Sequence, residues 1–442
     1  MRPISSSIKY FTNSPQMILI PAVGNATSKE ARRKEFLSGK ARDLYVEGYK
    51  KALQTKYTNI TSNVPTIPHT LKTSLNPALS RLNPIILGEI TDAIRTEFPQ
   101  SANWSEVRIS SKLVRIVAKT SGRIFVGPDL CRDEVYLDAA VNYTLDMTAA
   151  IQAVGFISPW LRPFLALRAP QVKKLHHRFQ QADDFLRPVV TARRQAAHND
   201  LDEKKKPDDM LQWLMDSQDK FGQQSDRAIS KYQLSLTFAA IHTTTAALTN
   251  AFYNLVAIPN LVSTLREEVE EILASTHGMI TATAVQRMVK LDSFLKEIMR
   301  YYPQSAIVPA GVILEVPSHA INYDETIHTN PETFDAFRFY KIRMEKEAAL
   351  RGKMSSEEAF TEAATSNQFA SVGDTSLAFG YGRNACPGRF FAANEMKMIL
   401  ATTLLKYDLK MPDGCPERYK NLSFGSQSVP DPAKSIMMKL RK

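Results

Sequence analysis

The stretch FGYGRNACPGRF, residues 379–390, places three glycines, one proline and one cysteine within twelve positions. The whole chain of 442 residues contains only 17 glycines and three cysteines, so this composition is local. A cysteine that stands between a glycine-rich turn and a helix-starting proline indicates a special environment for its sulfur. The fold and the function that the sequence predicts both follow from this stretch.

The cysteine is predicted to lie at the beginning of a helix. Cys386 precedes Pro387, and the residues after it, 389–405, have helical periodicity. Proline is favoured at the first helical position because its missing N–H would have no partner there. We therefore expect Cys386 to be the N-cap. Free backbone N–H groups and the positive end of the helix dipole would then favour the thiolate, which is the form that binds a metal.

The residues around the cysteine indicate what the sulfur binds. Gly380, Gly382 and Gly388 allow the backbone to turn sharply and to approach a flat group without a clashing side chain. Phe379 adds an apolar surface seven residues before the sulfur. The stretch is therefore predicted to form a socket for a planar cofactor with an axial thiolate, a haem iron.

Two other interpretations of the stretch are open at this point. A lone cysteine is often a small buried apolar residue. Gly380, Gly382 and Ala385 also fit the dinucleotide fingerprint G-x-G-x-x-A, which would indicate a nucleotide-dependent dehydrogenase. That fingerprint requires a buried strand before it, and the preceding residues 370–378 are not apolar enough to form one.

The overall composition is that of a globular protein, with 44% hydrophobic and 23% charged residues. Three scattered cysteines cannot form a disulfide framework and are typical of a reducing compartment. The net charge of +11 fits a solvated surface or a docking face for an acidic protein. The basic residues are scattered along the chain, so we expect no nucleic-acid partner.

Apolar periodicity predicts helices along most of the chain, including a long one at about 227–257. Short strands are expected at 310–316, 407–411 and 435–441. No obvious boundary divides this pattern, which predicts one large α-rich domain. The apolar run Met17–Val23 is too short to span a bilayer and lacks the layout of a signal peptide.

The spacing of Phe379, Gly382, Cys386 and Gly388 is F-x-x-G-x-x-x-C-x-G, and it resembles the haem-binding signature of the cytochrome P450 superfamily. The resemblance implies a mainly α fold, a large single helical domain with small β-sheets. It implies a haem domain over 36–442, after an N-terminal segment, 1–35, without a transmembrane anchor. It makes Cys386 the axial ligand of haem b, with Phe379, Gly382, Arg383 and Gly388 also binding the cofactor.

Two further segments carry the same resemblance. KEIMR, 296–300, holds Glu297 and Arg300 at E-x-x-R spacing on one helix face. NPETFDAFRF, 330–339, follows it and supplies Arg338. In the family these three residues form a buried network that supports the haem. E-x-x-R alone is common by chance, but its order before the later segment and the cysteine turn is not.

The segment AAIHTTT, 239–245, lies within the long predicted helix and resembles the family's oxygen-activation stretch. Thr243 matches the threonine that hydrogen-bonds dioxygen, and His242 stands where an acid is usual. An imidazole with a pKa near 6.5 can still relay protons. The alternative is that Thr243 only bonds back to a carbonyl one turn earlier in the helix.

The sequence style is similar to that of filamentous-fungal cytochromes P450 of secondary metabolism. This implies a monooxygenase that acts on a small apolar polycyclic substrate, of terpenoid or indole-diterpene type. It also implies electrons from NADPH through a flavoprotein reductase, a monomer, and a place on the cytosolic face of the endoplasmic reticulum membrane. Because the chain has neither an anchor nor a hinge, it could also be peripheral or cytoplasmic.

The chain also departs from the family pattern. The segments after residue 51 and after residue 300 are shorter than usual, and Asn384 replaces a basic residue. The alternative hypothesis is therefore a degenerate or truncated haem-fold protein with little or no turnover.

Overall fold

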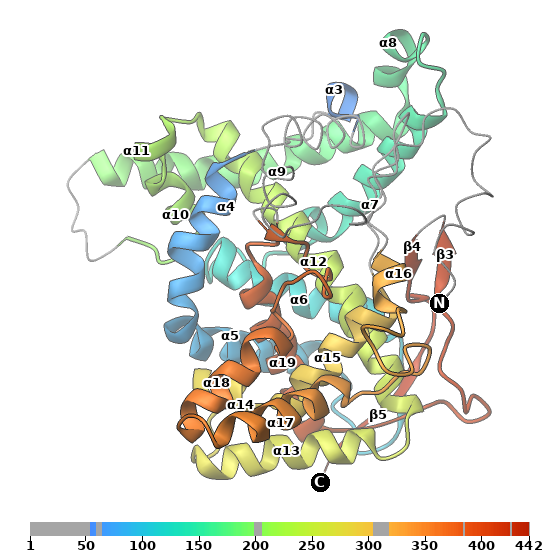
Figure 1. Ribbon diagram of the computed structural model, residues 1–442. Helices are drawn as coiled ribbons and strands as arrows, with labels where there is room; N and C mark the ends of the chain where they lie inside the picture. Colours follow the sequence, from blue (N-terminus) through green and yellow to red (C-terminus); the bar gives the residue numbers. More distant parts are fainter. Residues whose placement is uncertain are drawn as a thin grey trace, which may run out of the picture. The chain divides into compact units, whose positions relative to one another are not determined.

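The computed structural model describes residues 54–58, 64–198, 206–303, 318–382, 385–424 and 427–441. The described chain is mainly helical with small antiparallel sheets, as predicted (Figure 1). The predicted boundary at residue 35 and the expected strand at 310–316 lie outside the described residues. Contacts group the chain into two compact units, and each is described by itself.

The smaller unit includes the described residues 54–58 and 146–176. Its elements are α3 (Thr55–Thr58), the second half of α7 (Glu134–Phe156), α8 (Arg162–Leu165), a 3-10 turn (Ala166–Arg168) and the first turns of α9 (Pro170–His198). His176 Nε2 hydrogen-bonds the carbonyl oxygen of Tyr57 at 2.9 Å. Lys174 forms an ion pair with Asp146 at 2.7 Å.

The larger unit contains the remaining helices. They are α4 (Thr66–Thr70), a π-helical turn (Leu71–Leu75), α5 (Asn76–Glu97), α6 (Ile109–Phe125), α10 (Met210–Asp216), α11 (Gln218–Phe221), α12 (Asp226–Ala257), α13 (Leu261–Ser275), α14 (Ala282–Arg287), α15 (Val289–Tyr301), α16 (Ser318–Asn322), α17 (Arg338–Arg351), α18 (Ser356–Asn367) and α19 (Arg389–Lys406). The long helix predicted at 227–257 is α12, which begins one residue earlier than expected.

One local cap and one contact between helices explain where α12 and α15 begin. Ser225 is the N-cap of α12, and its side chain accepts a hydrogen bond from the N–H of Ala228. The first turn of α15 is capped from another helix, because the Glu268 carboxylate of α13 accepts the N–H groups of Lys290 and Leu291 at 2.6 and 2.9 Å. This contact satisfies donors that would otherwise have no partner and fixes α13 to α15.

The main sheet is antiparallel, with strand order β1 (Ser105–Val107), β5 (Ile436–Leu440), β2 (Tyr407–Lys410). A second sheet pairs β3 (Leu422–Phe424) with β4 (Gln427–Val429). The strands predicted at 407–411 and 435–441 are confirmed as β2 and β5. Helix α6 begins at Ile109, directly after β1, in which Val107 pairs with Ile436.

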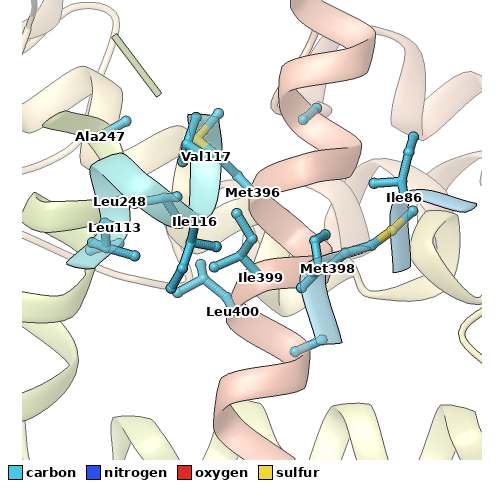
Figure 2. Packing of buried hydrophobic residues seen from close by; sticks show 14 of the residues in the cluster. Ile86, Leu113, Ile116, Val117, Ala247, Leu248, Met396, Met398, Ile399 and Leu400 are labelled. Carbon is cyan, nitrogen blue, oxygen red and sulfur yellow. The ribbon is translucent and has the colours of Figure 1, made fainter. Parts of the chain in front are cut away.

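One hydrophobic core of the larger unit gathers around α19 (Figure 2). Met396, Met398, Ile399 and Leu400 of this helix are buried. They pack among side chains of α5, α6 and α12, labelled in the figure as Ile86, Leu113, Ile116, Val117, Ala247 and Leu248. The helix that follows the cysteine stretch is thus held by the core.

Among the described residues, no helix combines the length and apolar composition that crossing a membrane requires.

One carboxyl group lies within this core. Glu395 of α19 is fully buried, and Ser121 Oγ of α6 donates a hydrogen bond to Glu395 Oε1 at 2.9 Å. Glu395 Oε2 has no partner in the described part of the chain. Burial disfavours the charged form and raises the pKa of Glu395 to about 8, although the bond from Ser121 acts against this shift.

We predict that Glu395→Gln reduces the pH dependence of stability. Because the pKa is raised from 4.5 in a free side chain to about 8, the folded protein keeps a proton that the unfolded chain releases. The stability of the native protein therefore decreases as the pH rises from 4.5 to 8, and Gln cannot contribute to this decrease. Thermal unfolding across this pH range measures the effect, with exposed Glu357→Gln as the control. Equal pH slopes for native protein and Glu395→Gln would contradict it.

Candidate active site

The cysteine stretch forms a tight turn before α19. The N–H of Cys386 donates to the carbonyl oxygen of Phe379 at 2.7 Å, which closes the turn. Gly380 and Gly382 have φ angles of +76° and +60°. Residues with a Cβ rarely adopt this left-handed conformation, so the turn requires glycine at both positions, as predicted.

The helix begins two residues later than predicted. Its N-cap is Gly388, not Cys386, and its first residue is Arg389. The Cys386 sulfur nevertheless accepts hydrogen bonds from the N–H groups of Gly388 and Arg389. The side chain of Cys386 is exposed, so the interpretation of this residue as a small core hydrophobe is wrong.

The N–H groups at the start of α19 favour the thiolate form of Cys386, as expected, but desolvation acts against them. Although solvent reaches the Cys386 side chain, surrounding protein desolvates the thiol and raises its pKa. The N–H groups of Gly388 and Arg389 and the Arg389 guanidinium act in the opposite direction but do not cancel this effect. Coordination to a metal ion would deprotonate the sulfur directly.

The surroundings of the sulfur fit a flat cofactor. A Cβ placed on Gly382 or Gly388 would meet no atom of the described chain within 4 Å, so both glycines border open space. Phe379 is half-buried, and its ring packs edge-on against Phe369 with centroids 5.1 Å apart. Arg383, also expected to bind the cofactor, lies outside the described residues.

Helix α12 presents an exposed face in its middle. Ala239 and Thr243, one turn apart, are exposed, whereas Ile241 and Thr244 are buried. Thr243 Oγ1 donates to the carbonyl oxygen of Ala239 at 2.8 Å, as the alternative interpretation required. A hydroxyl can exchange such an intrahelical bond for one to a ligand, so this geometry leaves the role of Thr243 in oxygen activation a prediction.

His242 is directed to a different neighbour. Its Nε2 hydrogen-bonds the carbonyl oxygen of Val141 in α7 at 2.8 Å. Desolvation lowers the pKa of His242 below its usual value of 6.5, despite this bond. The imidazole is therefore neutral at pH 7, and its Nε2–H donates to Val141.

The structure brings Glu297, Arg300 and Arg338 together. Arg300 donates from Nε and Nη2 to the two Glu297 carboxylate oxygens, both at 2.8 Å. Arg338 Nε lies 3.1 and 3.3 Å from the same oxygens. The side chains of Glu297, Arg300 and Arg338 are 0%, 3% and 8% exposed. One carboxylate thus pairs with two guanidinium groups inside the protein.

The two arginines also bind backbone carbonyls at the end of α16 and in the segment after it. Arg300 Nη1 donates to Asn322 at 2.5 Å, and Asn322 Nδ2 donates back to the Arg300 carbonyl at 2.9 Å. Arg338 Nη2 donates to Thr333 at 2.7 Å. Asn322 could not be predicted from the sequence, because amide-to-backbone contacts leave no spacing pattern.

Two other features of this region were also not foreseen. Asp292 of α15 and Lys397 of α19 form a buried ion pair at 2.5 Å. Arg389 contacts two carbonyl oxygens beside Cys386. The positive end of the helix dipole disfavours a cation at the first helical position. This unfavourable placement is a sequence feature from which a role for Arg389 could have been predicted.

The dinucleotide interpretation is wrong. In residues 370–379, directly before Gly380, the structure has only an isolated bridge between Gly373 and Ser376, not the required buried strand. The named strands of the described residues pair antiparallel, whereas the fingerprint belongs to a parallel βαβ unit.

We predict that Glu297→Gln destabilises the fold strongly, by about 3–5 kcal/mol, because it leaves two buried guanidinium groups without a countercharge. Exposed Glu345→Gln on α17 is the matched control and should change little. Chemical denaturation of the purified proteins measures both changes. A loss below about 1 kcal/mol for Glu297→Gln would show that the network does not hold the fold.

Comparison with known proteins identifies the family of the chain. The profile of the family "Cytochrome P450" matches residues 69–437. Cytochrome P450 monooxygenase ATR3 of Stachybotrys chlorohalonatus is 34% identical over 88% of this chain and 82% of its own length. Cytochrome P450 monooxygenase paxP of Penicillium paxilli is 32% identical, over 87% of this chain and 75% of its own.

Ent-kaurene oxidase P450-4 of Gibberella fujikuroi is also 32% identical, over 83% of this chain and 72% of its own length. The family match covers most of the chain, including both the Glu297 network and the cysteine stretch. The family also implies a haem iron, which fits the exposed sulfur and the open space beside the two glycines. The chain therefore belongs to the cytochrome P450 family of monooxygenases.

Proposed function

We propose that the protein is a haem-thiolate monooxygenase of fungal secondary metabolism that oxidises an apolar polycyclic metabolite, of terpenoid or indole-diterpene type. The observation that carries this proposal is the exposed Cys386 sulfur, held before a core helix and beside two glycines that border open space. Haem b held by the Cys386 sulfur would supply the activation of dioxygen.

Cys386 is the residue that would hold the iron. Its backbone is fixed by the bond to Phe379, and its sulfur is oriented by the N–H groups of Gly388 and Arg389. Phe379, Gly382, Arg383 and Gly388 complete the proposed cofactor site. Glu297, Arg300 and Arg338 support it without touching the reacting atoms.

Thr243 is the proposed residue for proton delivery. Its hydroxyl lies on the exposed face of α12, where a bound substrate could reach it. His242 is the second candidate, but a neutral imidazole bonded to Val141 is less suited to deliver a proton. We therefore assign the larger contribution to Thr243.

The substrate class and the partners rest on the resemblance. The similarity to a protein named ent-kaurene oxidase supports a terpenoid substrate. Electrons would come from NADPH through a flavoprotein reductase, and the net charge of +11 suits an acidic flavin domain. We propose a monomer on the cytosolic face of the endoplasmic reticulum membrane, without a nucleic-acid partner.

Purified protein reconstituted with haem should give a red-shifted Soret band in the reduced, carbon-monoxide-bound state. Cys386→Ser should abolish this band because it removes the thiolate, whereas Cys415→Ser, at another exposed cysteine, should keep it. The same band in Cys386→Ser would refute the ligand assignment. Haem binding without NADPH consumption, in the presence of a reductase and candidate diterpenes, would favour the degenerate-protein alternative.

Thr243→Ala should reduce product formation on the order of 10²-fold, as expected for loss of an acid–base group, with substrate affinity unchanged. His242→Ala should have a smaller effect. Product per NADPH consumed and the substrate-induced spectral change measure the two quantities. Wild-type product formation by Thr243→Ala would leave only the intrahelical bond as the role of this threonine.

A further inference from the structure

Arg389 is an unusual residue at the start of α19. It is the first helical residue and lies three positions after Cys386. The positive end of the helix dipole disfavours a cation at this position. Where a sequence breaks such a local rule, a compensating role near a functional site is the usual reason.

The contacts of Arg389 show what compensates for its position. Nη1 donates to the carbonyl oxygen of Cys386 at 2.9 Å, and Nε donates to that of Ala370 at 3.0 Å. The guanidinium carbon lies 4.4 Å from the centre of the Phe390 ring. Within the described residues, no carboxylate forms an ion pair with Arg389. The guanidinium therefore keeps its full positive charge beside the cysteine.

The carbonyl of Ala370 is a firm anchor, because the preceding residue is fixed from two sides. The N–H of Phe369 donates to Asp292 Oδ2 of α15 at 2.7 Å, and Asp292 pairs with Lys397 of α19 at 2.5 Å. The Phe369 ring packs against Phe379. Arg389 thus connects the cysteine to a segment that buried charges hold in place.

Together these contacts hold both backbone polar groups of Cys386. Its N–H is bonded to Phe379, and its carbonyl is bonded to Arg389. Phe379 and Arg389 in turn both contact the 369–370 segment. The Cys386 peptide is therefore part of a closed ring of contacts, and Arg389 is the member that bridges two carbonyls at once.

We propose that Arg389 is a positioning residue for the haem ligand and that its charge raises the reduction potential of the haem iron. This inference rests on the proposed function. The planar guanidinium donates to two carbonyls from fixed directions, which a lysine ammonium cannot reproduce. A positive charge near the sulfur destabilises the ferric state relative to the ferrous state, because the ferric centre carries one more positive charge.

Two variants separate the positioning role from the charge. Arg389→Met removes both the guanidinium contacts and the charge, whereas Arg389→Lys keeps the charge and loses the bridge. Arg266→Met is the matched control, because Arg266 donates to the carbonyls of Leu404 and Tyr407 at the opposite end of α19. Arg266 also donates to the Asp408 carboxylate. The Arg266→Met variant therefore removes an arginine with similar bonds at a position far along the helix from Cys386.

The measurements are the rate of haem release to an excess of apomyoglobin and the reduction potential of the reconstituted protein. Arg389→Met and Arg389→Lys should both release haem about 10-fold faster, as for other residues that orient a metal ligand. Only Arg389→Met should shift the potential to a more negative value. Arg266→Met should lower the unfolding temperature without changing the potential.

The proposal fails if Arg389→Met has the wild-type potential, or if Arg266→Met shifts the potential equally. If Arg389→Met retains no haem, the rate of haem release from Arg389→Lys is the decisive measurement. A wild-type rate in Arg389→Lys would overturn the positioning role. Failure of the proposed function itself is distinguishable, because the wild-type protein would then show no thiolate-ligated haem at all.

Discussion

The buried charges of α15 are the constraint on which the rest of the site depends. Glu297 pairs with both Arg300 and Arg338 and so ties α15 to the start of α17. One turn earlier in the helix, Asp292 pairs with Lys397 of α19. Each charge has lost its water, so each is tolerated only while its partners stay in place. The same electrostatic requirement therefore fixes the helices relative to one another.

This constraint reaches the cysteine through short contacts. Asp292 binds the N–H of Phe369 as well as Lys397, so one carboxylate fixes both α19 and the segment before the turn. Phe369 supports Phe379, whose carbonyl holds the N–H of Cys386. The exposed sulfur is thus carried by groups that are mostly buried. A metal ligand would gain from this arrangement, because buried groups behind it fix the position of its backbone.

The sequence predicted those features that a spacing pattern can encode. The order of Glu297, Arg300 and Arg338, the long α12 and the glycines of the turn all follow from periodicity or motif. It did not predict the beginning of α19 or the protonation of Cys386, because these depend on competing energies. Proline is compatible with the first helical position but does not force a helix to begin there, and the helix begins at Arg389.

The protonation of Cys386 shows why such a competition cannot be read from a motif. Two N–H groups and a guanidinium favour the thiolate, yet the loss of water around the sulfur outweighs them and raises the pKa. The donors therefore orient the sulfur more than they acidify it. In the proposed site, coordination to a metal ion would remove the proton of Cys386 directly. The polypeptide would then supply the position of the ligand, and the metal would supply its charge state.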